Sequence, residues 1–171
     1  MLTLSLLRHA KSNRDDPLVE DFERPLAKRG AKAAPVVGAW LGSHELVPDM
    51  VLCSGAIRTR ATLALVLPAF PTQPGRIVYD DDLYLAPAGD LLGAIRRIKD
   101  PARHVMVVGH NPGLHALALS LIRSGDKADL AALAEGFPTC ALAVFTFDAE
   151  EWSGIGHARG RLIHFVTPRQ L

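Results

Sequence analysis

Apolar and polar positions alternate at the start of the chain in the pattern of a β-strand. Leu2, Leu4 and Leu6 recur with a period of two and therefore share one face, because neighbouring side chains of a strand point to opposite faces. Further short apolar runs predict more strands. These runs cover residues 50–53, 76–79, 104–109, 140–147 and 161–166.

Apolar residues between these runs recur with helical spacing. In residues 25–43 an apolar face lies opposite a basic one, which predicts an amphipathic helix that Pro35 should kink or start late. Because strands alternate with helices, the sequence predicts the α/β class. We expect a three-layer α/β/α sandwich with a mainly parallel central sheet, whose last two strands are candidates for an antiparallel edge. Other helices are predicted over residues 55–68, about 88–99, from 112 onward and 128–135.

Length and composition narrow the class of protein. A chain of 171 residues without a linker, repeat or low-complexity tract predicts a single domain over residues 1–171. The formal net charge of +1 gives no indication of a nucleic-acid partner or a membrane surface. No apolar run is long enough for a signal peptide or a membrane span, which predicts a cytoplasmic protein. Cys53 and Cys140 lie in apolar runs and should be buried thiols rather than a disulfide.

Arg8 and His9 stand where the first apolar run ends and a polar stretch, residues 10–17, begins. Open α/β sheets bind ligands at the carboxyl ends of their strands. A guanidinium beside an imidazole at that edge suits an anion, phosphate above all, because arginine offers a planar fork of donors. An isolated Arg-His pair is also typical of a surface arginine beside a half-buried histidine.

Two other strand ends repeat this arrangement. The run 104–109 ends in His110, followed by Asn111 as a candidate N-cap and Pro112 as a candidate first helical residue. A helix N-terminus there would favour an anion. The run 50–53 is followed by Ser54, a candidate N-cap, and by Arg58, which can reach back over the strand end, whereas Arg60 faces elsewhere. Three strand ends, each with a cation or an imidazole, predict a phosphate site.

The residues at these strand ends resemble the histidine phosphatase superfamily, which has the phosphoglycerate-mutase-like fold. In this short chain they are most similar to the small SixA-type phosphohistidine phosphatases. The resemblance runs in order from residue 2 to about residue 125 and weakens in the last third. It rests on LLRHAKS (6–12), CSGAIRTRAT (53–62) and VVGHNPGL (107–114), with Arg24-Pro25-Leu26, Lys28-Arg29-Gly30 and Leu83-Tyr84-Leu85-Ala86 between them.

The resemblance implies roles for the matching positions. His9 matches the nucleophile that takes up the phosphoryl group, and His110 matches a second catalytic histidine that, with the phosphate-binding residues Arg8 and Arg58, holds the phosphoryl oxygens. Independently, nearby cations favour the neutral form that a histidine nucleophile needs. Phosphoryl transfer depends mainly on positioning and charge stabilisation, so we expect no metal and no cofactor.

The chain departs from the family pattern at the general acid. Members of the mutase type carry a glutamate after the second motif, and Leu85 takes its place here. Asp82, just upstream, is a possible acid, although a solvated carboxylate on a loop is an equally good interpretation. A second departure, Ala10 after the histidine, is common among SixA-like proteins. Whether Ser12, Asn13 and Arg24 border the pocket is left open.

These features predict a metal-independent phosphatase that works through a phosphohistidine intermediate, with phosphohistidine in proteins as the expected substrate. A small-molecule phosphomonoesterase of the same fold and a non-catalytic phosphate-binding module are the alternatives. A mutase would need the missing acid and longer insertions. The sequence contains no HExxH, CxxC or GxGxxG pattern, which disfavours a metallohydrolase or a dinucleotide-binding protein. The expected partner is a phosphorylated protein or a small phosphate ester.

Overall fold

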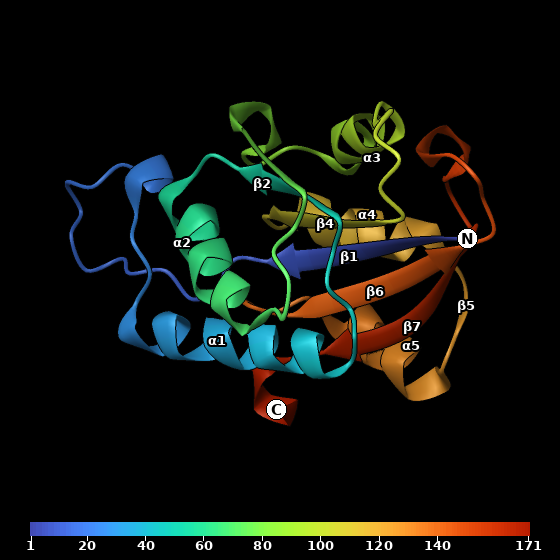
Figure 1. Cartoon of the computed structure of the whole chain (residues 1–171). Helices are drawn as coiled ribbons and strands as arrows, with labels where there is room; N and C mark the ends of the chain where they lie inside the picture. The colour runs from blue at the N-terminus through green and yellow to red at the C-terminus, as the bar shows by residue number, and fades with distance from the viewer.

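A seven-stranded sheet runs through the middle of the molecule, which the computed structural model describes over all 171 residues (Figure 1). The strands lie in the order β3-β2-β4-β1-β6-β7-β5. All six predicted strands are present, and β5 is additional. The strands are β1 Leu2–Arg8, β2 Met50–Ser54, β3 Arg76–Asp80, β4 His104–Gly109, β5 Ile122–Gly125, β6 Leu142–Phe147 and β7 Gly160–Val166.

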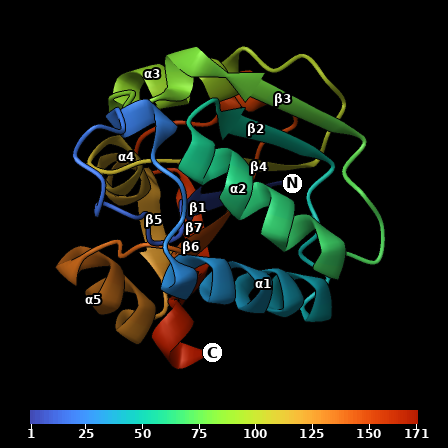
Figure 2. The ribbon, with the colours of Figure 1, turned by 90° about the vertical axis from the view of Figure 1, so that its left-hand side faces the viewer.

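Helices cover both faces of the sheet (Figure 2). Helices α1 and α2 lie on one face, and α3, α4 and α5 lie on the other. None of them is long and apolar enough to cross a membrane. The helices are α1 Lys28–Ser43, α2 Ile57–Val66, α3 Ala88–Arg96, α4 Gly113–Leu121 and α5 Lys127–Glu135, with short 3-10 helices at Asp21–Glu23 (η1), Leu67–Ala69 (η2), Asp81–Leu83 (η3), Trp152–Gly154 (η4) and Pro168–Gln170 (η5).

The alternation of side chains along β1 divides the interior into two hydrophobic cores. Leu2, Leu4 and Leu6 lie in the larger core, against α3 and α4. Leu7 points to the other face and lies in the smaller core under α1 and α2. The predicted alternation in the first strand and the three-layer arrangement are therefore confirmed. Cys53 and Cys140 are buried free thiols of the smaller core, as expected.

The sheet is mixed, and the prediction of a mainly parallel sheet is wrong. β3, β2, β4 and β1 pair in parallel, but β6 is antiparallel to both of its neighbours, β1 and β7. The antiparallel strand lies inside the sheet, and β5, parallel to β7, forms the edge. Between β6 and β7 only the three-residue η4 intervenes, and such a connection lacks the crossover helix that parallel neighbours usually need.

Three local predictions need correction. Helix α1 begins at Lys28 and continues through the exposed Pro35, which therefore does not mark a late start. Ser54 is the last residue of β2 rather than an N-cap, and α2 begins only at Ile57. Asn111 does not cap α4 either, because the N-cap is Pro112 and the helix begins at Gly113; the Asn111 side-chain amide instead donates to the Phe137 carbonyl oxygen at 2.9 Å.

The register of the parallel strands brings three strand ends to one edge of the sheet. Arg8 pairs with Gly109, and Cys53 pairs with Val108. The residues that follow these pairs are His9, His110 and Ser54, and they must therefore be neighbours. The N-termini of α2 and α4 begin just beyond the same edge. This is the convergence that the sequence predicts.

Two glycines let neighbouring segments approach that edge closely. A Cβ atom on Gly113, the first residue of α4, would lie 1.9 Å from the Ala86 carbonyl oxygen. A Cβ atom on Gly30 in α1 would lie 2.2 Å from the Lys11 carbonyl oxygen. The first contact holds the segment of Tyr84 to Ala86 against the start of α4, and the second holds α1 against the loop that follows His9.

Candidate active site

The ring of His9 is fixed by the backbone immediately after β1. Its Nδ1 lies 2.7 Å from the Ala10 carbonyl oxygen. Because a carbonyl oxygen only accepts, Nδ1 carries the proton of the neutral ring and Nε2 carries the lone pair. The Nε–H of Arg58 donates to this Nε2 at 3.3 Å. The unprotonated nitrogen of the ring therefore faces the guanidinium of Arg58.

The surroundings of His9 keep the ring neutral. Burial is the largest reason that the pKa of His9 is lowered to about 4. The hydrogen bond to Ala10 raises this pKa, and the positive charges of Arg58, Arg8 and Arg24 lower it. At neutral pH Nε2 therefore keeps an unprotonated lone pair.

Arg58 reaches the site from the first turn of α2, and its side chain is only 2% exposed. Besides His9, it contacts Asp21 of η1 twice. Arg58 Nη1 donates to the backbone oxygen of Asp21 at 2.6 Å, and Nη2 donates to the Asp21 carboxylate at 3.0 Å. Because a guanidinium has five N–H donors, donors remain for a ligand beside His9. The predicted reach of Arg58 over the strand ends is confirmed.

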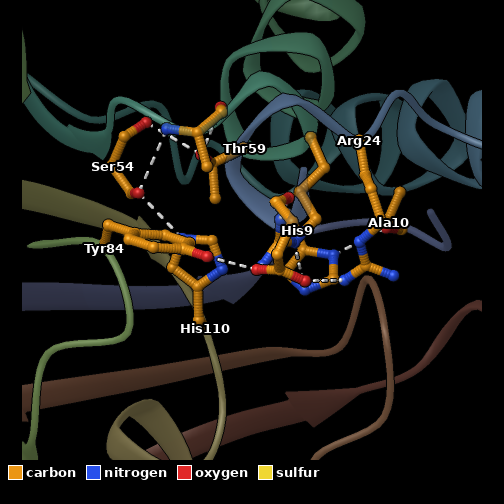
Figure 3. Close-up of polar contacts among 10 residues, drawn as sticks. His9, Ala10, Arg24, Ser54, Thr59, Tyr84 and His110 are labelled. Atoms are coloured by element: carbon orange, nitrogen blue, oxygen red, sulfur yellow. Dashed lines mark hydrogen bonds and ion pairs between the residues drawn. The ribbon is translucent and has the colours of Figure 1, made fainter. Parts of the chain in front are cut away.

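His110 lies beside His9, with 5.3 Å between the ring centroids. Its Nε2 is 2.7 Å from the hydroxyl oxygen of Ser54. Tyr84 packs against the His110 ring, with 5.3 Å between their centroids and nearly perpendicular planes. Burial is the largest cause that lowers the pKa of His110 to about 3, followed by the charges of His9 and Arg58. Figure 3 shows the rings of His9, His110 and Tyr84 gathered in one place.

Arg8 and Arg24 add two more guanidiniums. Arg8 Nη1 donates to the Phe137 carbonyl oxygen at 2.9 Å, so the segment before β6 holds this side chain. Burial, and then the charges of Arg14 and Arg58, lower the pKa of Arg8. Arg24 is buried and pairs with Asp21 at 2.6 Å. The sequence left the position of Arg24 open, and the structure places it at the site.

Several buried donors at this edge lack a partner within the protein. The buried side-chain nitrogens and oxygens without a hydrogen bond are Arg8 Nε, Arg24 Nε, His110 Nδ1 and Asn111 Oδ1. An unsatisfied buried polar group is costly and calls for an explanation. The three nitrogens belong to residues that surround His9, and two of them are on cations. This clustering is the pattern expected of a site that binds an anion.

Asp21 is the residue that sequence reasoning missed. Its carboxylate accepts from Arg58, Arg24 and the Tyr84 hydroxyl. The hydrogen bond from Tyr84 is the largest cause that lowers the pKa of Asp21 to about 2, helped by Arg58 and Arg24. In the sequence, the spacing of three residues between Asp21 and Arg24 is the one indication that the two side chains can pair. Asp21 does not stand out there, because residues 15–23 contain four other acidic side chains.

Asp82 and Arg60 lie apart from this cluster. Asp82 is exposed, its backbone N–H donates to Asp80 at 2.9 Å, and its side chain forms no hydrogen bond or ion pair with the residues around His9. Leu85, which stands in place of the family glutamate, is 49% exposed with a φ of 50°. Arg60 is exposed and lies over the Tyr79 ring at 4.6 Å, in agreement with the prediction that it faces elsewhere.

Comparison with known proteins agrees with the geometry. No model of a protein family matches the chain. An uncharacterized protein of Mycobacterium tuberculosis is 37% identical over 165 residues, which cover 95% of this chain and 100% of the relative. The crystal structure of the "putative phosphohistidine phosphatase SixA" from Agrobacterium tumefaciens has a TM-score of 0.81 and 33% identity, with 98% of each chain covered. The SixA structure from Nakamurella has a TM-score of 0.78 and 29% identity, covering 98% of this chain and 96% of that one.

The fold and the cluster define an α/β protein with two histidines and three arginines at the carboxyl edge of its sheet. With the similarity over almost the whole chain, they show the class: the chain belongs to the histidine phosphatase superfamily, and within it to the SixA type. The resemblance seen in the sequence is therefore confirmed.

Proposed function

We propose that the protein is a phosphatase in which His9 is the nucleophile and a phosphohistidine is the intermediate. The observation that carries the proposal is the orientation of the His9 ring. Its Nδ1–H donates to the Ala10 carbonyl oxygen, so that Nε2 carries no proton and faces Arg58, from which it accepts a hydrogen bond at 3.3 Å. His110, Arg8 and Arg24 place further nitrogens around the same position.

In the first step the lone pair of His9 Nε2 attacks phosphorus. The bond from phosphorus to the leaving atom breaks, and its electron pair departs with the leaving group. Arg8, Arg58 and His110 hold the phosphoryl oxygens, where the negative charge is spread. We assign Arg24 to the same role, because its buried Nε also lacks a partner.

In the second step water attacks the phosphorus of phospho-His9, and the bond to Nε2 breaks. The proton on Nδ1 stays in its hydrogen bond to Ala10 throughout. The ring of the intermediate is therefore a protonated, positively charged imidazole and leaves as a neutral one. No proton donor is needed for this step, and inorganic phosphate is released.

Phosphohistidine in proteins is the substrate we propose. An alkoxide leaves poorly without a proton donor, and the site offers none opposite His9: Leu85 stands at the position of the acid, and Asp21 is ionised because its pKa is about 2. A phosphorylated imidazole can take its proton from solvent beforehand and then leave neutral. The names of the similar SixA structures agree with this choice. A cytoplasmic location stays a prediction from the sequence.

The test is turnover and trapping of the intermediate with His9→Ala. Wild-type protein should hydrolyse p-nitrophenyl phosphate and phosphohistidine in the presence of a chelator, and alkaline quenching of ³²P-labelled enzyme should trap an acid-labile phosphohistidine. His9→Ala should abolish both signals. His157→Ala, at an exposed histidine, is the matched control and should behave as wild type.

Full activity in His9→Ala, or activity that only added zinc restores, would overturn the proposal. Binding of tungstate without any turnover would instead favour a non-catalytic phosphate-binding module.

A further inference from the structure

Asp21 supplies the one carboxylate that bonds to the residues around His9. It enters from η1, a surface segment, and its side chain is 48% exposed, whereas its partner Arg58 is 2% exposed. The carboxylate thus lies at the boundary between the buried phosphate site and solvent. A leaving group, which must lie opposite His9 on phosphorus, has to extend from the site toward solvent.

The Asp21 carboxylate has room for another donor. Its Oδ2 accepts from Arg58 and from the Tyr84 hydroxyl, but Oδ1 accepts only from Arg24, at 2.6 Å. Each carboxylate oxygen can accept about two hydrogen bonds. One lone pair of Oδ1 therefore remains free, on a side chain that a substrate can reach.

The negative charge of Asp21 is opposite in sign to the charges of the arginines around the site. Arg8, Arg24 and Arg58 attract a phosphoryl group, but together they repel any leaving group that is itself positively charged. Asp21 is the charge of opposite sign, and it is ionised at neutral pH because its pKa is about 2. It offsets that repulsion on the solvent side of the site, and it disfavours leaving groups that bring only negative charge.

We propose that Asp21 is a specificity-determining residue that accepts a hydrogen bond from the protonated ring of an N-phosphorylated imidazole. This inference rests on the function proposed above and names the group that recognises its substrate. The ring nitrogen that is not bonded to phosphorus carries a proton and donates a hydrogen bond to the Asp21 carboxylate. A phosphate monoester has neither this donor nor the positive charge.

The chemical step balances without proton transfer. The bond between His9 Nε2 and phosphorus forms while the bond between phosphorus and the leaving ring nitrogen breaks. The electron pair of the broken bond neutralises the leaving ring, whose other nitrogen keeps its proton in the hydrogen bond to Asp21. Asp21 stays ionised, so it acts as an acceptor and not as the missing general acid.

The experiment compares two substrates in Asp21→Asn and in a control. We would measure kcat/KM for 3-phosphohistidine and for p-nitrophenyl phosphate, whose phenolate leaves without a proton. Glu23→Gln is the matched control, because it neutralises another exposed carboxylate of η1 that has no hydrogen bond or ion pair to the site. Asp21 is at the surface, and activity on p-nitrophenyl phosphate reports whether the variant is folded.

For Asp21→Asn we expect kcat/KM for 3-phosphohistidine to fall roughly 10- to 100-fold further than kcat/KM for p-nitrophenyl phosphate, the usual loss for a hydrogen bond to a charged group; any loss common to both substrates reports the contacts of Asp21 with Arg58 and Arg24. Glu23→Gln should change neither. Equal losses on both substrates would overturn the inference, because Asp21 would then only hold Arg58 in place. Unchanged turnover of both would overturn it as well. If wild-type protein itself fails to hydrolyse 3-phosphohistidine, the proposed function fails, whatever the variants do.

The pH dependence supplies a second readout. The advantage of wild type over Asp21→Asn on 3-phosphohistidine should disappear above the pKa of the substrate ring, which ³¹P NMR titration of the substrate measures. The groups that face Asp21 are Arg24, Arg58, Tyr84 and His110. The pKa of His110 is lowered to about 3 and that of Tyr84 is raised above its ordinary value of 10.0, so neither titrates between about pH 6 and 9. An advantage that is independent of pH would overturn the inference.

Discussion

Arg58 and Arg60 lie two residues apart on α2 and offer a direct test of the proposed phosphate site. Arg58 is buried beside His9, whereas Arg60 is exposed over the Tyr79 ring. Arg58→Ala should lower kcat/KM for p-nitrophenyl phosphate, because it removes a guanidinium aimed at the developing charge. Loss of one such donor typically costs ~10²–10³ in rate.

The structure indicates that the loss should lie at the upper end of this range. Arg58 donates to His9 Nε2 and makes two hydrogen bonds to Asp21. Its removal therefore takes away a donor to the phosphoryl group and also leaves the Asp21 carboxylate without this positively charged partner. That carboxylate would then repel a phosphate dianion. Arg58→Lys should lose less than Arg58→Ala, because it keeps the charge but cannot bond to Asp21 and to the phosphoryl group with one planar fork.

The assay is steady-state kinetics of wild type, Arg58→Ala, Arg58→Lys and Arg60→Ala, together with calorimetric titration of tungstate as a phosphate analogue. Arg60→Ala should remain within about threefold of wild type, because its side chain is solvated and an exposed substitution has little effect. Tungstate affinity should follow the order of the rates. Equal activity of the two alanine variants, or unchanged tungstate affinity in Arg58→Ala, would refute the assignment of Arg58.

Three further predictions concern pH, Asp82 and the leaving group. Burial lowers the pKa of His9 and His104 to about 4 and that of His110 to about 3, against 6.5 for a free ring. As the pH falls, the histidines of the unfolded chain therefore take up protons before those of the folded protein. The free energy of unfolding should decrease between about pH 6.5 and 4, by up to about 1.4 kcal/mol per pH unit for each histidine. Urea unfolding at a series of pH values measures this free energy, and a constant value over that interval would contradict the prediction. Asp82→Asn should barely change turnover of phosphohistidine, and wild type should hydrolyse phosphohistidine and aryl phosphates ~10²–10⁴ faster than phosphoserine or 3-phosphoglycerate. A wild-type profile that is flat across leaving groups and becomes steep in Asp82→Asn would identify Asp82 as the acid.

The sequence predicts the centre of the site well because that centre depends on local patterns. An apolar run followed by Arg8 and His9 defines a strand end, and a second run places His110 in the same way. The parallel register then brings the two strand ends together, because Arg8 pairs with Gly109. The position of Arg58 follows similarly from the short distance between β2 and the first turn of α2.

The parts that the sequence does not predict depend on contacts between distant segments. Asp21 joins the site only because η1 packs beside α2. Its partner Arg58 is 37 residues away in the sequence. The hydrogen bond between Ser54 and His110 spans 56 residues. Strand β5 has four residues and starts with Ile122, which continues the apolar spacing of α4, so no local signal separates the two. The interior position of β6 likewise depends on pairing with β1 and β7.

The hydrogen bond between His9 Nδ1 and the Ala10 carbonyl has a thermodynamic consequence for the proposed reaction. It directs phosphorylation to Nε2, so the intermediate is the same chemical species as a substrate histidine phosphorylated at that nitrogen. Transfer from one to the other breaks one phosphorus–nitrogen bond and forms another of the same kind, so little bond free energy is released in this step. The free energy released by the overall reaction then belongs almost entirely to hydrolysis of phospho-His9, and until water arrives the phosphoryl group can return to the protein that delivered it.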